Sequence, residues 1–116
     1  MPKELRKLGF DKEELRAAAY DYCLRTNIHV PQAAISDIEI GEDPAAAVTL
    51  KFDTLDVNDV KEVRLNRDQM GAALIRYCGE QKIPIPRRGQ KILKIEGEEI
   101  ALMINIHWAP AGEKKE

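Results

Sequence analysis

The sequence predicts an α+β fold in which a (β)αββ unit occurs twice. Two helices pack on one face of a mainly antiparallel sheet, and the halves are related by an approximate two-fold axis. Three observations support this prediction. The chain repeats itself at an offset of 55 residues, each half contains one amphipathic helical segment, and each such segment is followed by two segments of alternating apolar residues. At this offset the Tyr-Cys pair at 22–23 falls on the pair at 77–78, and Pro31 falls on Pro86.

The length of 116 residues suits one domain, because a chain of this size can bury most of its apolar surface. We expect residues 1–109 to form a single globular domain whose halves span about 5–52 and 60–107. Residues 53–59 then serve as a short polar linker, and the C-terminal residues 110–116 are expected to form a disordered tail.

A weak strand pattern opens each half, at residues 5–10 and 60–65. Each is followed by a candidate capping box, Asp11-x-x-Glu14 or Asn66-x-x-Gln69, which predicts a helix start. The helices are expected from Lys12 to about residue 27 and from Arg67 to about residue 82. Their apolar residues follow the spacing of one amphipathic stripe: Leu15, Ala18, Ala19, Tyr22 and Cys23 in the first helix, and Met70, Ala73, Leu74, Tyr77 and Cys78 in the second.

Two strands are expected after each helix. In the first half, Ile38 and Ile40 alternate with acidic residues, residues 41–44 form a turn, and residues 46–52 follow with a period of two. In the second half, residues 91–95 lead through a turn at 96–98 into residues 100–106. One extra residue in the first turn keeps the apolar faces of the two halves in phase. Two copies of a unit can differ in this way because a change in loop length costs little stability.

The composition indicates a soluble chain, with 44% apolar and 33% charged residues. No apolar run approaches the ~20 residues that cross a bilayer, and the first residues lack the apolar core of a signal peptide. We therefore expect a cytoplasmic protein without a membrane partner, and two reduced cysteines rather than a disulfide.

Although the net charge is only −2, the chain contains an acidic segment and a basic segment. Residues 33–62 hold eight acids and two lysines, a balance of −6, whereas residues 64–94 hold eight bases and two acids, a balance of +6. The candidate site for an anion or a partner is the basic group Lys82, Arg87, Arg88, Lys91 and Lys94. None of the equivalent residues of the first half is basic, so the shared scaffold does not require these charges. The prolines stiffen the backbone before the arginine pair, and arginine forks suit phosphate or carboxylate.

Catalytic motifs are lacking in the sequence, and we expect no enzyme, no cofactor and no metal. Asp37 and Glu39 share a strand face and could act as an acid–base or metal pair, although exposed sheet faces carry such residues routinely. An enzyme would require these carboxylates, a histidine (His29 or His107) and a cysteine to meet in one cleft. Cys23 and its counterpart at 78 lie on apolar helix stripes, where the prediction is burial rather than reactivity.

The composition therefore favours a non-enzymatic interaction or regulatory module. It would bind a protein partner, or itself as a homodimer, through complementary acidic and basic surfaces. The alternative is nucleic-acid or anionic-ligand binding through the basic stretch 82–94, dominated by phosphate contacts because no aromatic residue lies among the basic ones.

Overall fold

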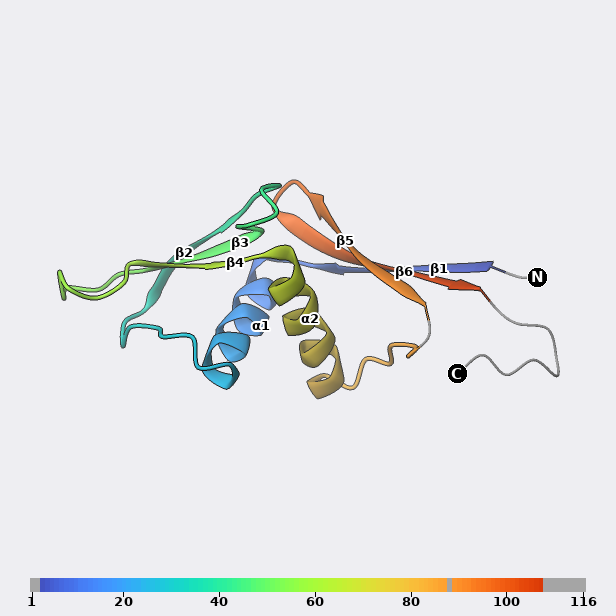
Figure 1. Ribbon diagram of the computed structural model, residues 1–116, viewed down its shortest axis with the longest axis horizontal. Helices are drawn as coiled ribbons and strands as arrows, with labels where there is room; N and C mark the ends of the chain where they lie inside the picture. The colour runs from blue at the N-terminus through green and yellow to red at the C-terminus, as the bar shows by residue number, and fades with distance from the viewer. Residues whose placement is uncertain (1–2, 88, 108–116) are drawn as a thin grey trace.

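The fold is α+β, with two helices and two three-stranded antiparallel sheets in this computed structural model (Figure 1). The structure describes residues 3–87 and 89–107, so the tail expected at 110–116 lies outside the described residues. The elements in chain order are β1 (Lys3–Phe10), α1 (Lys12–Arg25), β2 (Ile35–Ile40), β3 (Val48–Phe52), β4 (Glu62–Leu65), α2 (Arg67–Glu80), β5 (Gln90–Glu96) and β6 (Glu99–His107).

The strands form two sheets rather than the single sheet that the sequence suggested. Sheet A has the order β1-β6-β5 and sheet B has the order β2-β3-β4. Each sheet therefore combines a hairpin from one half of the chain with the first strand of the other half. The expectation of one sheet was wrong because alternation of apolar residues shows which face of a strand is buried, but not which strand lies beside it.

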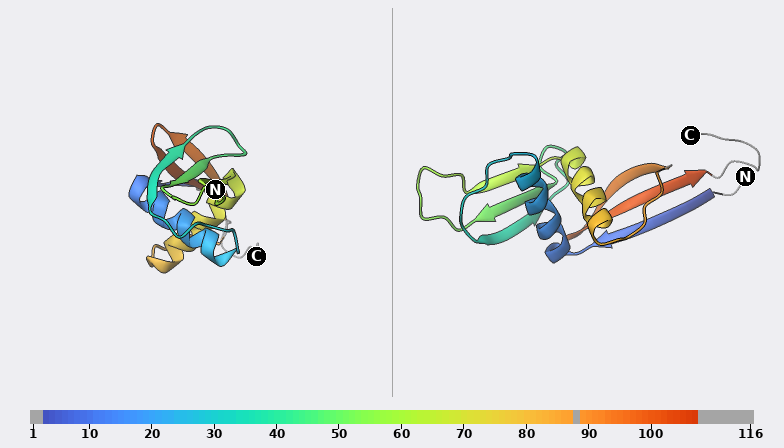
Figure 2. Two further views of the ribbon diagram at one scale, coloured as in Figure 1. Left: turned by 90° about the vertical axis from the view of Figure 1, so that its left-hand side faces the viewer. Right: turned by 90° about the horizontal axis from the view of Figure 1, so that it is seen from below.

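The two helices lie side by side in the middle of the molecule, and the sheets extend away from them at opposite ends (Figures 1 and 2). In Figure 1 both helices lie below the sheets. The ring of Phe10, at the end of β1, meets that of Tyr77 on α2 edge to face, with centroids 6.1 Å apart. A strand of the first half thus packs on the helix of the second half.

The helix ends repeat in detail. Both predicted capping boxes are present, with Asp11 and Asn66 as the N-caps. Each helix ends two residues earlier than expected, because Asn27 and Lys82 each adopt a left-handed conformation with φ of 60°. The next backbone N–H then turns back to a carbonyl five residues earlier, from Ile28 to Cys23 and likewise in α2, which is the Schellman arrangement.

One hydrophobic core unites the elements. The helix stripes are buried as predicted, at Leu15, Ala18, Ala19 and Cys23 of α1 and at Met70, Ala73, Leu74 and Cys78 of α2. The buried strand residues facing them include Val48, Leu50 and Phe52 on β3 and Ile100, Leu102, Ile104 and Ile106 on β6. β3 begins two residues later than expected, because the turn before it is longer and closes with a bond from the Gly41 N–H to the Ala47 carbonyl.

Four charged side chains link the two helices, and they occupy equivalent positions. Arg25 Nη2 lies 3.1 Å from Glu80 Oε2, and Arg76 Nε lies 3.6 Å from Asp21 Oδ2. Position 25 is equivalent to 80, and position 21 to 76, at the 55-residue offset. Each residue therefore faces its own counterpart, and the paired charges are opposite.

Candidate functional site

The basic residues singled out in the sequence do not converge on one point. Lys82 lies in the turn two residues after the end of α2 and Arg87 lies in the loop that follows; both are exposed. Arg88 lies outside the described residues. Lys91 and Lys94 lie on β5, and their separation of three residues places them on opposite faces of the strand.

These cations also differ in their partners. Lys91 Nζ lies 3.4 Å from the carbonyl oxygens of Arg87 and Gly89, so its ammonium is directed at the preceding loop. Lys94 Nζ lies 3.6 Å from a carboxylate oxygen of Glu96. Lys82 and Arg87 have no carboxylate within 4.0 Å in the part of the chain that the structure describes. Among the described members of this basic group, Lys82 and Arg87 are thus the two cations without a close oxygen partner.

The outer face of sheet B, opposite the helices, is polar, and four of its five charged residues form ion pairs within it. Two cross-strand rows form it, Asp37–Lys51–Glu62 and Glu39–Thr49–Arg64. Lys51 Nζ lies 2.9 Å from Glu39 Oε2, and Arg64 Nη2 lies 3.4 Å from Glu62 Oε1. The Glu39 carboxylate, which accepts the hydrogen bond from Lys51, raises the pKa of that lysine.

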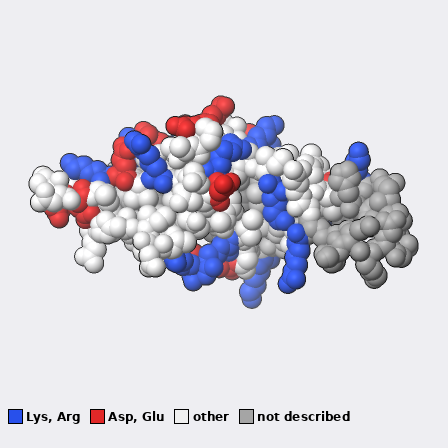
Figure 3. All heavy atoms as spheres, viewed as in Figure 1, with Lys and Arg blue, Asp and Glu red and all other residues white. Residues whose placement is uncertain are grey.

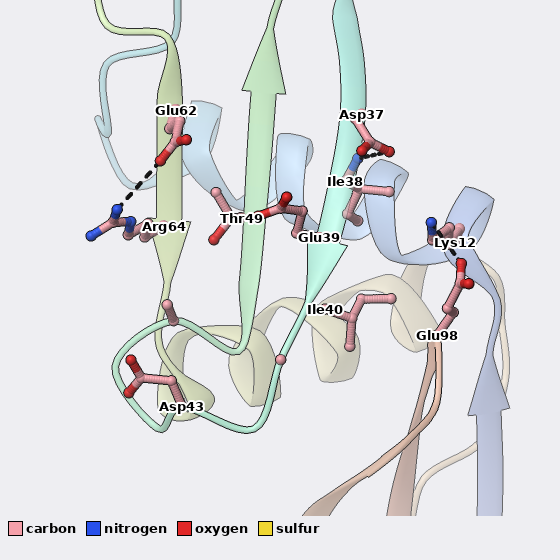
Figure 4. A pocket seen from close by; sticks show the side chains of 12 residues that line it. Lys12, Asp37, Ile38, Glu39, Ile40, Asp43, Thr49, Glu62, Arg64 and Glu98 are labelled. Carbon is pink, nitrogen blue, oxygen red and sulfur yellow. Dashed lines mark hydrogen bonds and ion pairs between the residues drawn. The ribbon is translucent and has the colours of Figure 1, made fainter.

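A depression of about 630 Å³ lies over this face and along the edge of β2 (Figure 4). Figure 4 shows the Glu62–Arg64 pair on one side of it and the Lys12–Glu98 pair, 2.7 Å apart, on the other. Bonding to Glu98 raises the pKa of Lys12. The depression contains both carboxylates of the suggested acid–base pair, Asp37 and Glu39, but neither a cysteine nor a histidine lines it.

The two cysteines and His29, which the enzyme hypothesis also considered, lie elsewhere. Cys23 and Cys78 are fully buried in the core, and burial raises the pKa of both thiols. His29 Nε2 lies 2.8 Å from Asp59 Oδ1, a contact that lowers the pKa of this aspartate. Within residues 3–87 and 89–107, no group of three His, Cys, Asp or Glu side chains is arranged to hold a metal ion.

The outer face of sheet A differs from that of sheet B. Its rows are Lys7–Met103–Ile92, Leu5–Asn105–Gln90 and Gly9–Ala101–Lys94. Leu5 is 60% exposed and Ile92 is 45% exposed. The acids of β2 at 37 and 39 are thus replaced on β5 by an isoleucine and a lysine. In Figure 3 red and blue atoms mix over the sheet at the left, whereas blue predominates right of centre.

A groove of about 410 Å³ separates α2 from β5, the edge strand of sheet A. Its lining is mainly apolar, with cations from both elements: Arg67, Asp68, Gly71, Ala72, Ile75, Lys91, Ile92, Leu93 and Leu102. The first half has a counterpart between α1 and β2, but its volume is only about 180 Å³. Arg16 lines that smaller groove at the position equivalent to Gly71.

Sequence reasoning missed the groove because its residues carry no recognisable motif. The repeat did contain a signal, since the 55-residue offset aligns Arg16 with Gly71 and Asp37 with Ile92. Loss of a charge at both positions marks a surface that the second half does not share with the first. The approach of α2 to β5 follows from the tertiary fold and could not be read from spacing.

Among the described residues, no helix has the length and hydrophobicity required to cross a bilayer. Searches of protein-family models, of curated proteins and of solved structures found nothing that matches this chain.

Proposed function

We propose that the protein is a small non-enzymatic interaction module that binds a protein partner, or a second copy of itself, through complementary acidic and basic surfaces. The observation that carries this proposal is the contrast between the outer faces of the two sheets. The face of sheet B pairs its charges internally, through contacts such as Lys51–Glu39. The equivalent face of sheet A leaves Leu5 and Ile92 exposed beside Lys7 and Lys94, two lysines that share the one carboxylate of Glu96. Exposed apolar groups rimmed by charge are typical of interaction surfaces.

We also propose that the two halves descend from one duplicated unit and are related by an approximate two-fold axis, with both helices covering the same face of the sheets. The βαββ order occurs twice, and the capping boxes and left-handed helix ends recur at the same offset. Duplication supports the functional proposal, because a surface present in one half alone is not required by the common scaffold.

The test converts the outer face of sheet A to the chemistry of sheet B. The variant Lys94→Glu/Met103→Thr introduces the residues of the equivalent positions, Glu39 and Thr49. Lys61→Glu is the matched control, because it makes the same change in net charge at an exposed loop position. Partner capture from native extract at ~50 mM and ~500 mM salt is compared with gel filtration over a range of protein concentrations.

We expect the wild type and the control to retain a partner, or to self-associate, at low salt only, and the sheet A variant to lose this association. A protein that stays monomeric at every concentration, and captures the same material as the variant, would contradict the proposal.

A second candidate function is binding of nucleic acid or another anion through residues 82–94. The exposed cations of Lys82 and Arg87, which have no acidic partner in the described part of the chain, favour it. Titration with labelled DNA and RNA at ~50 mM salt tests it, because phosphate contacts weaken steeply as salt rises. Equal binding by wild type and Arg87→Ala/Arg88→Ala would exclude this candidate.

A further inference from the structure

We propose that the groove between α2 and β5 receives an extended segment of a partner protein, which adds to the free edge of β5 and carries acidic residues alternating with apolar ones. This inference rests on the proposed function as an interaction module, and it specifies the place and the chemistry of the partner.

The comparison of the two equivalent grooves is the first support. The helix–strand groove of the second half is more than twice as large as that of the first half, at about 410 Å³ against 180 Å³. Gly71 stands in the large groove where Arg16 stands in the small one. A Cβ added at Gly71 would meet nothing within 4 Å, so packing within the chain does not require a glycine there. Glycine weakens a helix interior, and its presence here keeps the groove open.

The walls of the groove provide apolar contact area. Ile75 on α2 is 41% exposed and Ile92 on β5 is 45% exposed, and both line the groove. Leu93 and Leu102, which are buried in the core, line the groove between them. An apolar side chain entering here would cover Ile75 and Leu93, whereas Ile92 projects from the opposite face of β5 and would lie beside the backbone of the added strand.

The edge of β5 provides the backbone groups that an added strand requires. Among the strands that the structure describes, β5 pairs only with β6, at the border of sheet A. The Arg67 guanidinium donates a hydrogen bond to the Leu93 carbonyl, which shows that this carbonyl is directed away from β6. In an antiparallel ladder the N–H and C=O of one residue point to the same side, so the Leu93 N–H also faces the free edge. An incoming strand can bond to both groups, as in other cases of strand addition.

The charges around the groove select an acidic segment. Arg67 and Lys91 line it against a single acid, Asp68. A strand that bonds to Leu93 would release the Arg67 guanidinium, and the positive charge of the groove would then favour a segment of negative net charge. On the other face of β5, Lys94 has its side chain 61% exposed and stands where acidic residues of an alternating segment would emerge. An alternating basic segment would meet direct repulsion at Lys94 and would also be repelled at longer range by Arg67 and Lys91.

The test uses a fluorescein-labelled octapeptide of alternating glutamate and valine, with an octapeptide of alternating lysine and valine as the charge control. The diagnostic variant is Gly71→Arg, which fills the large groove with the residue of the small one. The matched control is Gly79→Arg, the same substitution on the same helix at an exposed glycine outside the groove, where an added Cβ also meets open space. Both variants should unfold at urea midpoints no lower than that of the wild type, since arginine favours helix over glycine.

We expect the acidic peptide to bind the wild type and Gly79→Arg equally, and Gly71→Arg at least tenfold more weakly, a loss of about 1.4 kcal/mol. In the wild type it should shift the methyl resonances of Ile75 and Ile92 and slow amide exchange at Leu93. Equal binding by both arginine variants, equal binding of the basic peptide, or shifts confined to other residues would overturn the proposal. So would a concentration-dependent dimer that Gly71→Arg abolishes, because the occupant would then be a second copy.

The outcomes separate this inference from the proposed function. If association is lost in the sheet A variant but Gly71→Arg binds the acidic peptide normally, the interaction module stands and the groove assignment fails. If no salt-dependent association exists at all, the proposed function itself fails.

Discussion

Exchange of the charges between α1 and α2 tests the proposed two-fold relation, which predicts a coupling energy between the two helices. The first variant, Asp21→Arg/Arg25→Glu, gives α1 the charges of α2. The second, Arg76→Asp/Glu80→Arg, gives α2 the charges of α1. Every variant keeps an opposite pair four residues apart within each helix. Either exchange alone places like charges at both cross-helix contacts, whereas the combined exchange restores both. The exchanges also alter the charge in the last turn of each helix, in opposite directions, so that these dipole effects largely cancel in the combined exchange.

The magnitude follows from the geometry of the two contacts. The N–O distances are 3.1 and 3.6 Å, and the four side chains are 34% to 47% exposed. An exposed ion pair of this kind contributes about 0.2–1 kcal/mol after solvent screening. Turning two attractions into two repulsions should therefore lower the free energy of unfolding by about 1–2 kcal/mol in either single exchange. The combined exchange should return to within about 0.5 kcal/mol of the wild type.

Urea denaturation of the four proteins measures this, at ~50 mM and ~500 mM salt, and the coupling should shrink at the higher salt. If the combined exchange is destabilised by the sum of the two single exchanges, the helices do not meet at equivalent positions and the two-fold reasoning is refuted.

Three further predictions concern single features. Burial raises the pKa of Cys23 and Cys78, so a thiol reagent at pH 8 should modify them only as fast as the protein opens, and rapid labelling in native buffer would contradict their burial. Bonding to Lys7 lowers the pKa of Glu96. The stability that this contact provides is present above the pKa of Glu96 in the unfolded chain and is lost as the pH falls through its pKa in the folded protein. An NMR titration of the Lys7→Met variant should therefore show a higher titration midpoint for Glu96 than in the wild type. Lys82→Gly should raise stability by about 0.5 kcal/mol in urea denaturation, because glycine relieves the left-handed conformation at a modest entropic cost, whereas a drop would mean that the lysine side chain stabilises the helix end.

Local features of the fold were predictable because short-range chemistry determines them. The capping residues Asp11 and Asn66 identified both helix starts, and apolar spacing identified the buried helix faces. The helix ends were placed too late because nothing in the sequence shows that Asn27 and Lys82 adopt a positive φ. Asparagine is a common choice at such a position, but lysine is not.

The long-range features of the fold were harder to predict from the sequence. Alternation in β1 and β4 did not reveal that each strand joins the hairpin of the opposite half. For the candidate site, charge counting selected five bases along the chain, but the geometry of β5 directs Lys91 and Lys94 to opposite faces. A count along the chain cannot distinguish the two faces of a strand, whereas comparison of equivalent positions in the two halves can.

Because β1 joins the hairpin of the second half and β4 joins that of the first, neither half of the chain contains all three strands of one sheet. A protease cut within the loop at 53–59 would separate the chain into two fragments, and each would expose the side of a hairpin that the other normally covers. Neither fragment should fold in isolation, yet the two mixed together should reconstitute the native structure. The protein therefore lends itself to use as a split reporter, in which recovery of the fold signals that two attached molecules have met.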